Sequence, residues 1–105
     1  MARVVLTASA ETGIEAIGRY VFRESQDLQA ALRVLDRIDE KTMAYARQPE
    51  MGDLRPDLGA EVRCFPVGNY VVIYRPLEDG ILVLLVVHGS RDVPAVFRDQ
   101  FGSNS

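Results

Sequence analysis

The sequence of 105 residues has no tryptophan, a single cysteine and a single histidine, and these shortages exclude several kinds of functional site. Cys64 alone can form neither an intramolecular disulfide nor a multi-cysteine metal site, so we expect a small packing residue on a strand. His88 has no second histidine or cysteine nearby with which to share a metal ion. We therefore expect neither a bound metal nor a cofactor.

Long hydrophobic runs are also missing. The longest apolar stretch, residues 81–87, is far shorter than the roughly 20 residues of a membrane-spanning helix. Residues 1–4 lack the charged region, the long apolar region and the cleavage site of a secretory signal. These absences predict a cytoplasmic protein that has no membrane partner.

Signatures of common catalytic sites are scarce. Gly89 and Ser90 follow an apolar run but lack the flanking glycines and the lysine of a phosphate-binding loop. His88, Ser90 and Asp92 are the residue types of a hydrolase triad. Alternate residues so close in sequence do not easily form the required chain of nucleophile, base and orienting group. We expect neither nucleotide-dependent chemistry nor acyl transfer.

Positive charge is in short supply, with a net charge of −3 and an isoelectric point near 5.1. Proteins that hold nucleic-acid phosphates usually concentrate lysine and arginine, so we expect no direct nucleic-acid binding. Four arginines in the second half form either a local basic face or weak surface pairs with carboxylates such as Glu61, Asp92 and Asp99. They are Arg63, Arg75, Arg91 and Arg98.

The remaining pattern predicts one domain over residues 1–101, followed by a disordered polar tail at 102–105. Residues 4–6 read as a strand, and Thr7 is placed to cap the helix that follows. A second helix opens after Ser25, and its apolar seam predicts an antiparallel hairpin with the first. The first stripe contains Ala10, Ile14, Ile17 and Val21, and the second contains Leu28, Ala31, Leu35, Ile38, Thr42 and Tyr45.

Both helices carry apolar side chains outside these stripes, namely Tyr20, Phe22, Leu32 and Met43. They either widen the core face or form a groove that accepts an amphipathic helix of a partner. We take these four residues as the candidate partner-binding surface.

The second half predicts a loop and three strands. Pro49 ends the second helix, residues 51–59 have loop composition, and strands follow at 62–65, 70–74 and 81–87. The last strand is apolar throughout, which favours a central place in the sheet. If the strand at 81–87 lies beside the first strand, the number of chain reversals between them predicts that the two run antiparallel. The strand at 62–65 is then the expected exposed edge.

Several segments together resemble a known family. They are the first-helix pattern of Ala10, Ile14, Ile17 and Tyr20-Val21, the turn with Pro49 and Gly52, the hairpin of Arg63 with residues 67–75, and the closing motif at 87–92. In this order they resemble ParE toxins of the RelE/ParE toxin–antitoxin superfamily, although Gly13 stands where an acidic residue is more usual. The fold that we expect is α+β: an N-terminal strand, an antiparallel helix hairpin packed on a mainly antiparallel sheet (β-α-α-β-β-β), and a short C-terminal helix or tail.

The resemblance implies a type II toxin that inhibits DNA gyrase and is neutralised by a ParD-like antitoxin bound across the helix hairpin and the sheet edge. Such a toxin needs no catalytic residues of its own, so we expect no enzyme. Its target-binding candidates are polar or amphipathic residues at strand positions without a required core role: Arg63, Tyr70, His88 and Arg91.

The alternative is a ribosome-dependent endoribonuclease of the RelE type. Cleavage by 2′-hydroxyl attack needs proton transfer and cationic stabilisation of the phosphorane. Glu61 or His88 could move protons, and Arg63 and Arg91 could stabilise charge. The sequence lacks the lysine-rich helix surface and the terminal aromatic cluster with which RelE-type nucleases are expected to bind ribosomal RNA. This difference favours the ParE branch.

Overall fold

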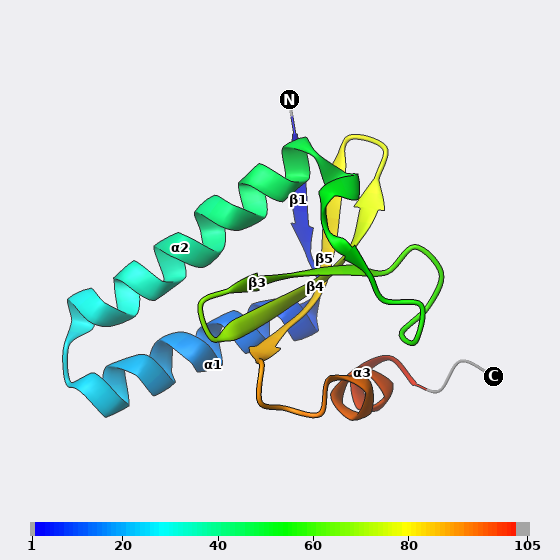
Figure 1. The fold of residues 1–105 in the computed structure, drawn as a ribbon. Helices are drawn as coiled ribbons and strands as arrows, with labels where there is room; N and C mark the ends of the chain where they lie inside the picture. Colours follow the sequence, from blue (N-terminus) through cyan, green and yellow to red (C-terminus); the bar gives the residue numbers. More distant parts are fainter. Residues whose placement is uncertain (1, 103–105) are drawn as a thin grey trace.

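A helix hairpin covers one face of a twisted sheet and a short C-terminal helix covers the other (Figure 1). The computed structural model describes residues 2–102. The elements are β1 (Arg3–Leu6), α1 (Ala8–Ser25), α2 (Leu28–Arg47), a 3-10 turn η1 (Pro49–Met51), β2 (Asp53–Leu54), β3 (Arg63–Val67), β4 (Tyr70–Leu77), β5 (Gly80–His88) and α3 (Val93–Phe101). The α+β fold is confirmed, with a helix at the C-terminal end. Residues 103–105 of the expected tail lie outside the described residues.

The two long helices begin at side-chain caps. Thr7 accepts a hydrogen bond from the Ala10 N–H, as predicted, and Asp27 caps α2 through the Gln29 N–H. The second helix therefore begins at Leu28, two residues later than the sequence suggested. Gln26 causes the delay, because it ends α1 in the left-handed conformation (φ 56°) and turns the chain. No helix within residues 2–102 has the length and apolar character to span a membrane.

The apolar strand was predicted to be flanked on both sides, and this is confirmed, because β5 lies between β1 and β4 in the sheet order β1-β5-β4-β3-β2. Val83 and Val86 of β5 face the helix hairpin, whereas Leu85 faces α3. Leu84 is a bulged residue, since Ile73 pairs with Leu85 and Tyr74 pairs with Val83. Both faces of β5 are thus covered, which explains its unbroken apolar sequence.

The predicted direction of this strand relative to the first is wrong. β1 and β5 run parallel, with Val4 opposite Ile81 and Leu6 opposite Val83. The count of reversals omitted β2, a strand of two residues inside the expected loop at 51–59. β2 runs antiparallel to β3, so it adds one reversal and inverts the direction of every later strand.

Six residues of the predicted apolar stripes join the core between the helix hairpin and the sheet: Ala10, Ile14, Ile17, Val21, Ile38 and Tyr45. Ala10, Ile17 and Ile38 are buried, but Leu28 is 58% exposed because it lies in the first turn of α2, beyond the sheet. Below the second helix, Tyr45 stacks on Phe65 with ring centroids 3.9 Å apart. Cys64 packs in the cluster beneath α3, as expected of a small strand residue.

Candidate functional site

A pocket of about 450 Å³ opens where α1 passes the end of β5. We call it the Tyr70 pocket. It is lined by Gly13, Ala16, Ile17, Tyr20, Tyr70, Val86, Val87, His88, Ser90 and Arg91. Three of the four residues predicted to contact a target are therefore brought together here. Tyr20, predicted for a different surface, joins them. The volume lies within the range of roughly 300–1,000 Å³ that is typical of ligand pockets.

Tyr70 and His88 form one wall of this pocket. They are direct partners in the β4–β5 ladder, and their rings meet edge to face with centroids 5.4 Å apart. Partial burial raises the pKa of the Tyr70 phenol, and the Tyr20 phenol adds a smaller effect in the same direction. Tyr70 is therefore a neutral hydroxyl at physiological pH, able to donate or accept a hydrogen bond.

The turn after β5 orients the polar rim. The Ser90 N–H donates to Nδ1 of His88 at 3.0 Å, so the neutral imidazole carries its proton on Nε2. The Arg91 N–H donates to the His88 carbonyl at 3.0 Å and closes the turn. Within residues 2–102 the Arg91 guanidinium makes no ion pair, and the adjacent Asp92 is occupied in capping α3 through the Ala95 N–H.

Arg63 lies elsewhere. Its Nη1 donates to the backbone carbonyls of Glu50 and Gly52, at 2.9 and 2.8 Å, and so ties the turn after α2 to the sheet. Arg63 lies opposite Tyr74 of β4, whereas His88 lies opposite Tyr70 of the same strand. Four residues of a strand span roughly 13 Å, so Arg63 and His88 are separated by about that distance along the sheet. Arg63, Arg75, Arg91 and Arg98 make none of the ion pairs found in the described part of the chain, whereas Arg55 pairs with Asp57 at 2.9 Å.

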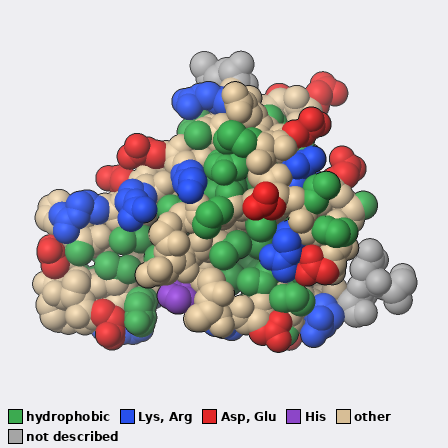
Figure 2. Space-filling view, in the orientation of Figure 1, with side chains coloured by type: hydrophobic (Ala, Val, Ile, Leu, Met, Phe, Trp, Pro, Cys, Tyr) green, Lys and Arg blue, Asp and Glu red, His purple; other side chains and the backbone are tan. Residues whose placement is uncertain are grey.

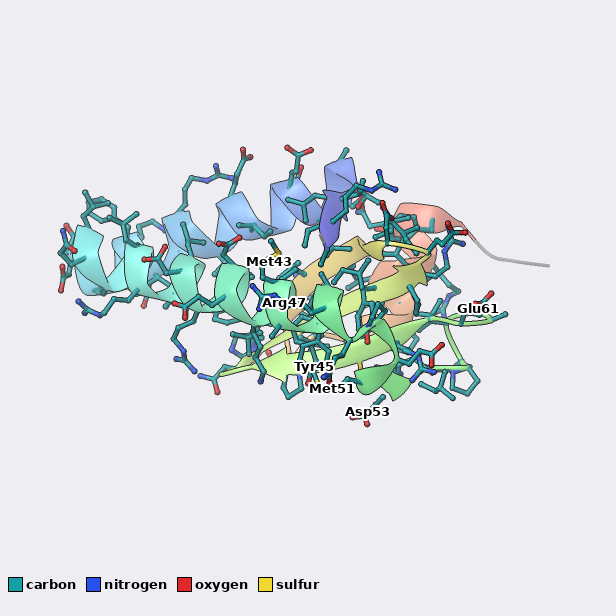
Figure 3. All side chains as sticks on the ribbon, turned by 90° about the horizontal axis from the view of Figure 1, so that it is seen from above. Met43, Tyr45, Arg47, Met51, Asp53 and Glu61 are labelled. Carbon is teal, nitrogen blue, oxygen red and sulfur yellow. The ribbon has the colours of Figure 1, made fainter. Side chains whose placement is uncertain are left out.

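Glu61 is farther still from the pocket. It is exposed, has a positive φ of 64°, and lies in the loop before β3, at the end of the molecule opposite the α1–α2 turn (Figure 3). The four residues of the nuclease alternative are thus split into Glu61 with Arg63 and His88 with Arg91. His88 is the single histidine, purple in Figure 2, and it lies at the surface near the end of β5.

The four residues predicted for partner binding do not form one surface. Tyr20 and Phe22 are about 200° apart around α1, because successive residues of a helix turn by about 100°. Tyr20 borders the Tyr70 pocket, whereas Phe22 and Leu32 are exposed by 45% and 43% away from it. Met43 is half-buried against the core, on the side of α2 toward α1 (Figure 3).

The expected exposed edge at 62–65 is wrong, because β2 covers it. Cys64 pairs with Asp53, and the Arg55 N–H donates to the Val62 carbonyl at 2.7 Å. Alternate residues of β3 face this side, so the next is Pro66, which has no N–H and whose carbonyl accepts from Nζ of Lys41. No pairing position on this side of β3 remains for a partner strand.

Two small residues of α1 were not predicted from the sequence to belong to a site. Gly13 and Ala16 line the Tyr70 pocket and leave room beside Tyr20. The available signal was their spacing, since residues 13, 16 and 20 recur three and four apart on one helix face. No group of His, Cys, Asp or Glu side chains within residues 2–102 is arranged to hold a metal ion.

Comparison with known proteins identifies the family. A solved structure from the chromosomal ParDE toxin–antitoxin system of P. aeruginosa has the same fold, with a TM-score of 0.68 and 19% identity over 84% of this chain and 96% of that chain. No curated protein sequence matches. The family model of the ParE toxin of the type II toxin–antitoxin system parDE matches residues 4–93. This match spans most of the chain, which therefore belongs to the ParE toxin family.

Proposed function

We propose that this protein is a toxin that inhibits DNA gyrase in the cytoplasm and is neutralised by a ParD-like antitoxin. The observation that carries the proposal is the family match over residues 4–93. The similar ParDE structure from P. aeruginosa supports an antitoxin partner for the same fold. In this proposal the toxin acts by binding and uses no cofactor.

The end of the helix hairpin near the α1–α2 turn is the proposed antitoxin site. Phe22, Leu28 and Leu32 are 45%, 58% and 43% exposed, and they lie within a few residues of the turn that joins α1 to α2. An amphipathic helix of the antitoxin would bury them. Tyr20 and Met43, the other two candidates, lie off this surface, since Tyr20 borders the Tyr70 pocket and Met43 packs against the core, so we propose only a secondary contact for them.

The rim of the Tyr70 pocket is the proposed gyrase-binding region. Tyr70, His88 and Arg91 combine aromatic surface with exposed donors, the composition of binding hot spots in protein interfaces. Arg63, the fourth candidate, donates from its guanidinium to backbone carbonyls outside the pocket. We therefore propose that Arg63 stabilises the turn after α2 and does not contact the target at the pocket rim.

The ribonuclease alternative receives less support from the geometry. A general acid and base must both reach the reacting phosphate group, within hydrogen-bond distance or through one water. Glu61 and Arg63 lie at the other end of β3 from His88 and Arg91. Only His88 and Arg91 are close enough to act together, and they offer no carboxylate base.

The deciding experiment compares two purified systems. Toxin is added to gyrase with supercoiled DNA and, separately, to translating ribosomes with a defined messenger RNA. We expect accumulation of gyrase-dependent DNA cleavage, reversal of that effect by the cognate antitoxin, and an intact messenger. Codon-phased cleavage of the messenger with no effect on gyrase would replace the proposal with the ribonuclease alternative.

A further inference from the structure

The Tyr70 pocket combines features that select one kind of ligand group. Its floor is apolar, since Ile17 and Val86 are buried and Gly13 adds no side chain. Its walls include the phenol rings of Tyr20 and Tyr70. Aromatic rings pack favourably in offset or edge-to-face contacts, so a flat aromatic group fits between these walls better than a flexible polar one.

The rim of the pocket provides hydrogen-bond donors. Nε2 of His88 carries the imidazole proton, because Nδ1 is occupied by the Ser90 N–H. The Arg91 guanidinium adds a positive charge that no carboxylate within residues 2–102 neutralises. None of the residues that line the pocket is acidic. A carboxylate is the group that these donors bind best, and the guanidinium can hold it with two parallel hydrogen bonds.

We infer that the Tyr70 pocket binds an aromatic side chain of a partner protein together with a neighbouring carboxylate of the same segment. The aromatic ring would lie between Tyr20 and Tyr70, and the carboxylate would meet Arg91 and His88. Tyrosine and arginine are the residue types enriched at the centres of protein interfaces, and Tyr20 is 49% exposed at the mouth. These features favour a protein segment as the occupant.

The inference rests on the proposed function only for the identity of the partner, and its test needs neither gyrase nor antitoxin. The absence of tryptophan from the chain allows a direct measurement, because any indole fluorescence comes from the probe. The probes are N-acetyltryptophan, which has a carboxylate, and N-acetyltryptophanamide, which has the same ring and no charge. Binding to the full chain is followed by fluorescence anisotropy.

We expect the acid to bind at least about fivefold more tightly than the amide. Arg91→Gln should remove this difference, whereas Arg98→Gln, which removes an exposed arginine of α3 outside the pocket, should preserve it. Ala16→Leu should fill the pocket and abolish binding of both probes. Ala8→Leu, an exposed position at the start of the same helix, should not.

Equal affinity for the acid and the amide, or unchanged binding in the folded Ala16→Leu variant, would overturn the inference. Absence of probe binding to the wild-type chain would also overturn it, and would leave the gyrase proposal standing. Conversely, wild-type toxin that binds the acid but leaves gyrase unaffected would refute the proposed function and keep the pocket assignment.

Discussion

Gly13 of α1 lies so close to Val86 of β5 that an added Cβ atom would overlap the Val86 carbonyl oxygen. The helix therefore approaches the central strand at a distance that only glycine permits. By propensity alone, glycine inside a helix is unfavourable by roughly 1 kcal/mol relative to alanine. The contact explains why packing outweighs that propensity at this position.

Gly13→Ala should destabilise the protein even though alanine favours the helix. The methyl group has to push α1 away from β5, and such overpacking typically costs about 1–3 kcal/mol. Urea unfolding monitored by circular dichroism measures the change. Gly18→Ala is the matched control: a Cβ atom added there would meet Cδ1 of Leu35 at 3.2 Å, and because a side-chain end can shift more easily than backbone, a smaller loss or a gain is expected. Equal stability of Gly13→Ala and wild type would contradict the close packing.

Phe22→Ser and Leu32→Ser should each weaken antitoxin binding. Burying a large apolar side chain contributes about 1.5–3 kcal/mol, which corresponds to roughly 10- to 150-fold in the dissociation constant. Calorimetry with the cognate antitoxin gives the affinity. Phe101→Ser serves as the control, because Phe101 is 40% exposed on α3, which lies on the other face of the sheet from the helix hairpin. Unchanged affinity in both folded helix variants would remove the hairpin surface from the model.

Tyr74→Phe should lower stability through two lost hydrogen bonds. The buried phenol donates to the Pro49 carbonyl at 2.7 Å and accepts from the Gly52 N–H at 3.0 Å. Leaving such buried groups without partners costs about 1–3 kcal/mol. Thermal unfolding measures the loss, and Tyr20→Phe, at a half-exposed ring, is the control. A melting temperature equal to that of wild type would mean that the phenol is dispensable.

The same phenol makes the stability depend on pH in alkaline solution. Burial raises the pKa of Tyr74 above that of the unfolded chain, near 10, so its stabilising effect is complete below about pH 10. As the pH rises from there toward the folded-state pKa, the unfolded state ionises first and that effect is lost. The free energy of unfolding, measured between pH 8 and 11, should therefore decline less steeply with pH for Tyr74→Phe than for the wild-type protein. Parallel profiles for the two proteins would refute this linkage.

His88→Gln should leave toxicity substantially intact. Glutamine keeps a hydrogen-bond donor near the place of Nε2 but cannot transfer a proton near neutral pH. A ribonuclease that depended on this histidine would lose about 100-fold or more in rate. Growth inhibition on induction and the gyrase cleavage assay report the outcome. Loss of toxicity together with loss of messenger cleavage would favour catalysis over binding.

Local signals were sufficient for much of the fold. The cap at Thr7, the stripe through Ala10 and Ile17, and the unbroken apolar run of β5 each follow from interactions within a few residues or from burial alone. Such features depend on side-chain period and polarity, which the sequence shows directly. The short strand β2 was missed because two exposed residues carry no periodicity. That omission alone inverted the predicted direction of β5 relative to β1.

The sequence by itself determined the two long helices, the longer strands, the interior position of β5 and the family resemblance, because these depend on local periodicity and on motif order. Only the tertiary structure decided which candidate residues meet. It joined Tyr20 of α1 to Tyr70, His88 and Arg91 through the close approach at Gly13, and it placed Arg63 under the turn after α2. The physical reason is that these neighbours are set by strand register and helix packing across distant parts of the chain, and no local pattern encodes those distances.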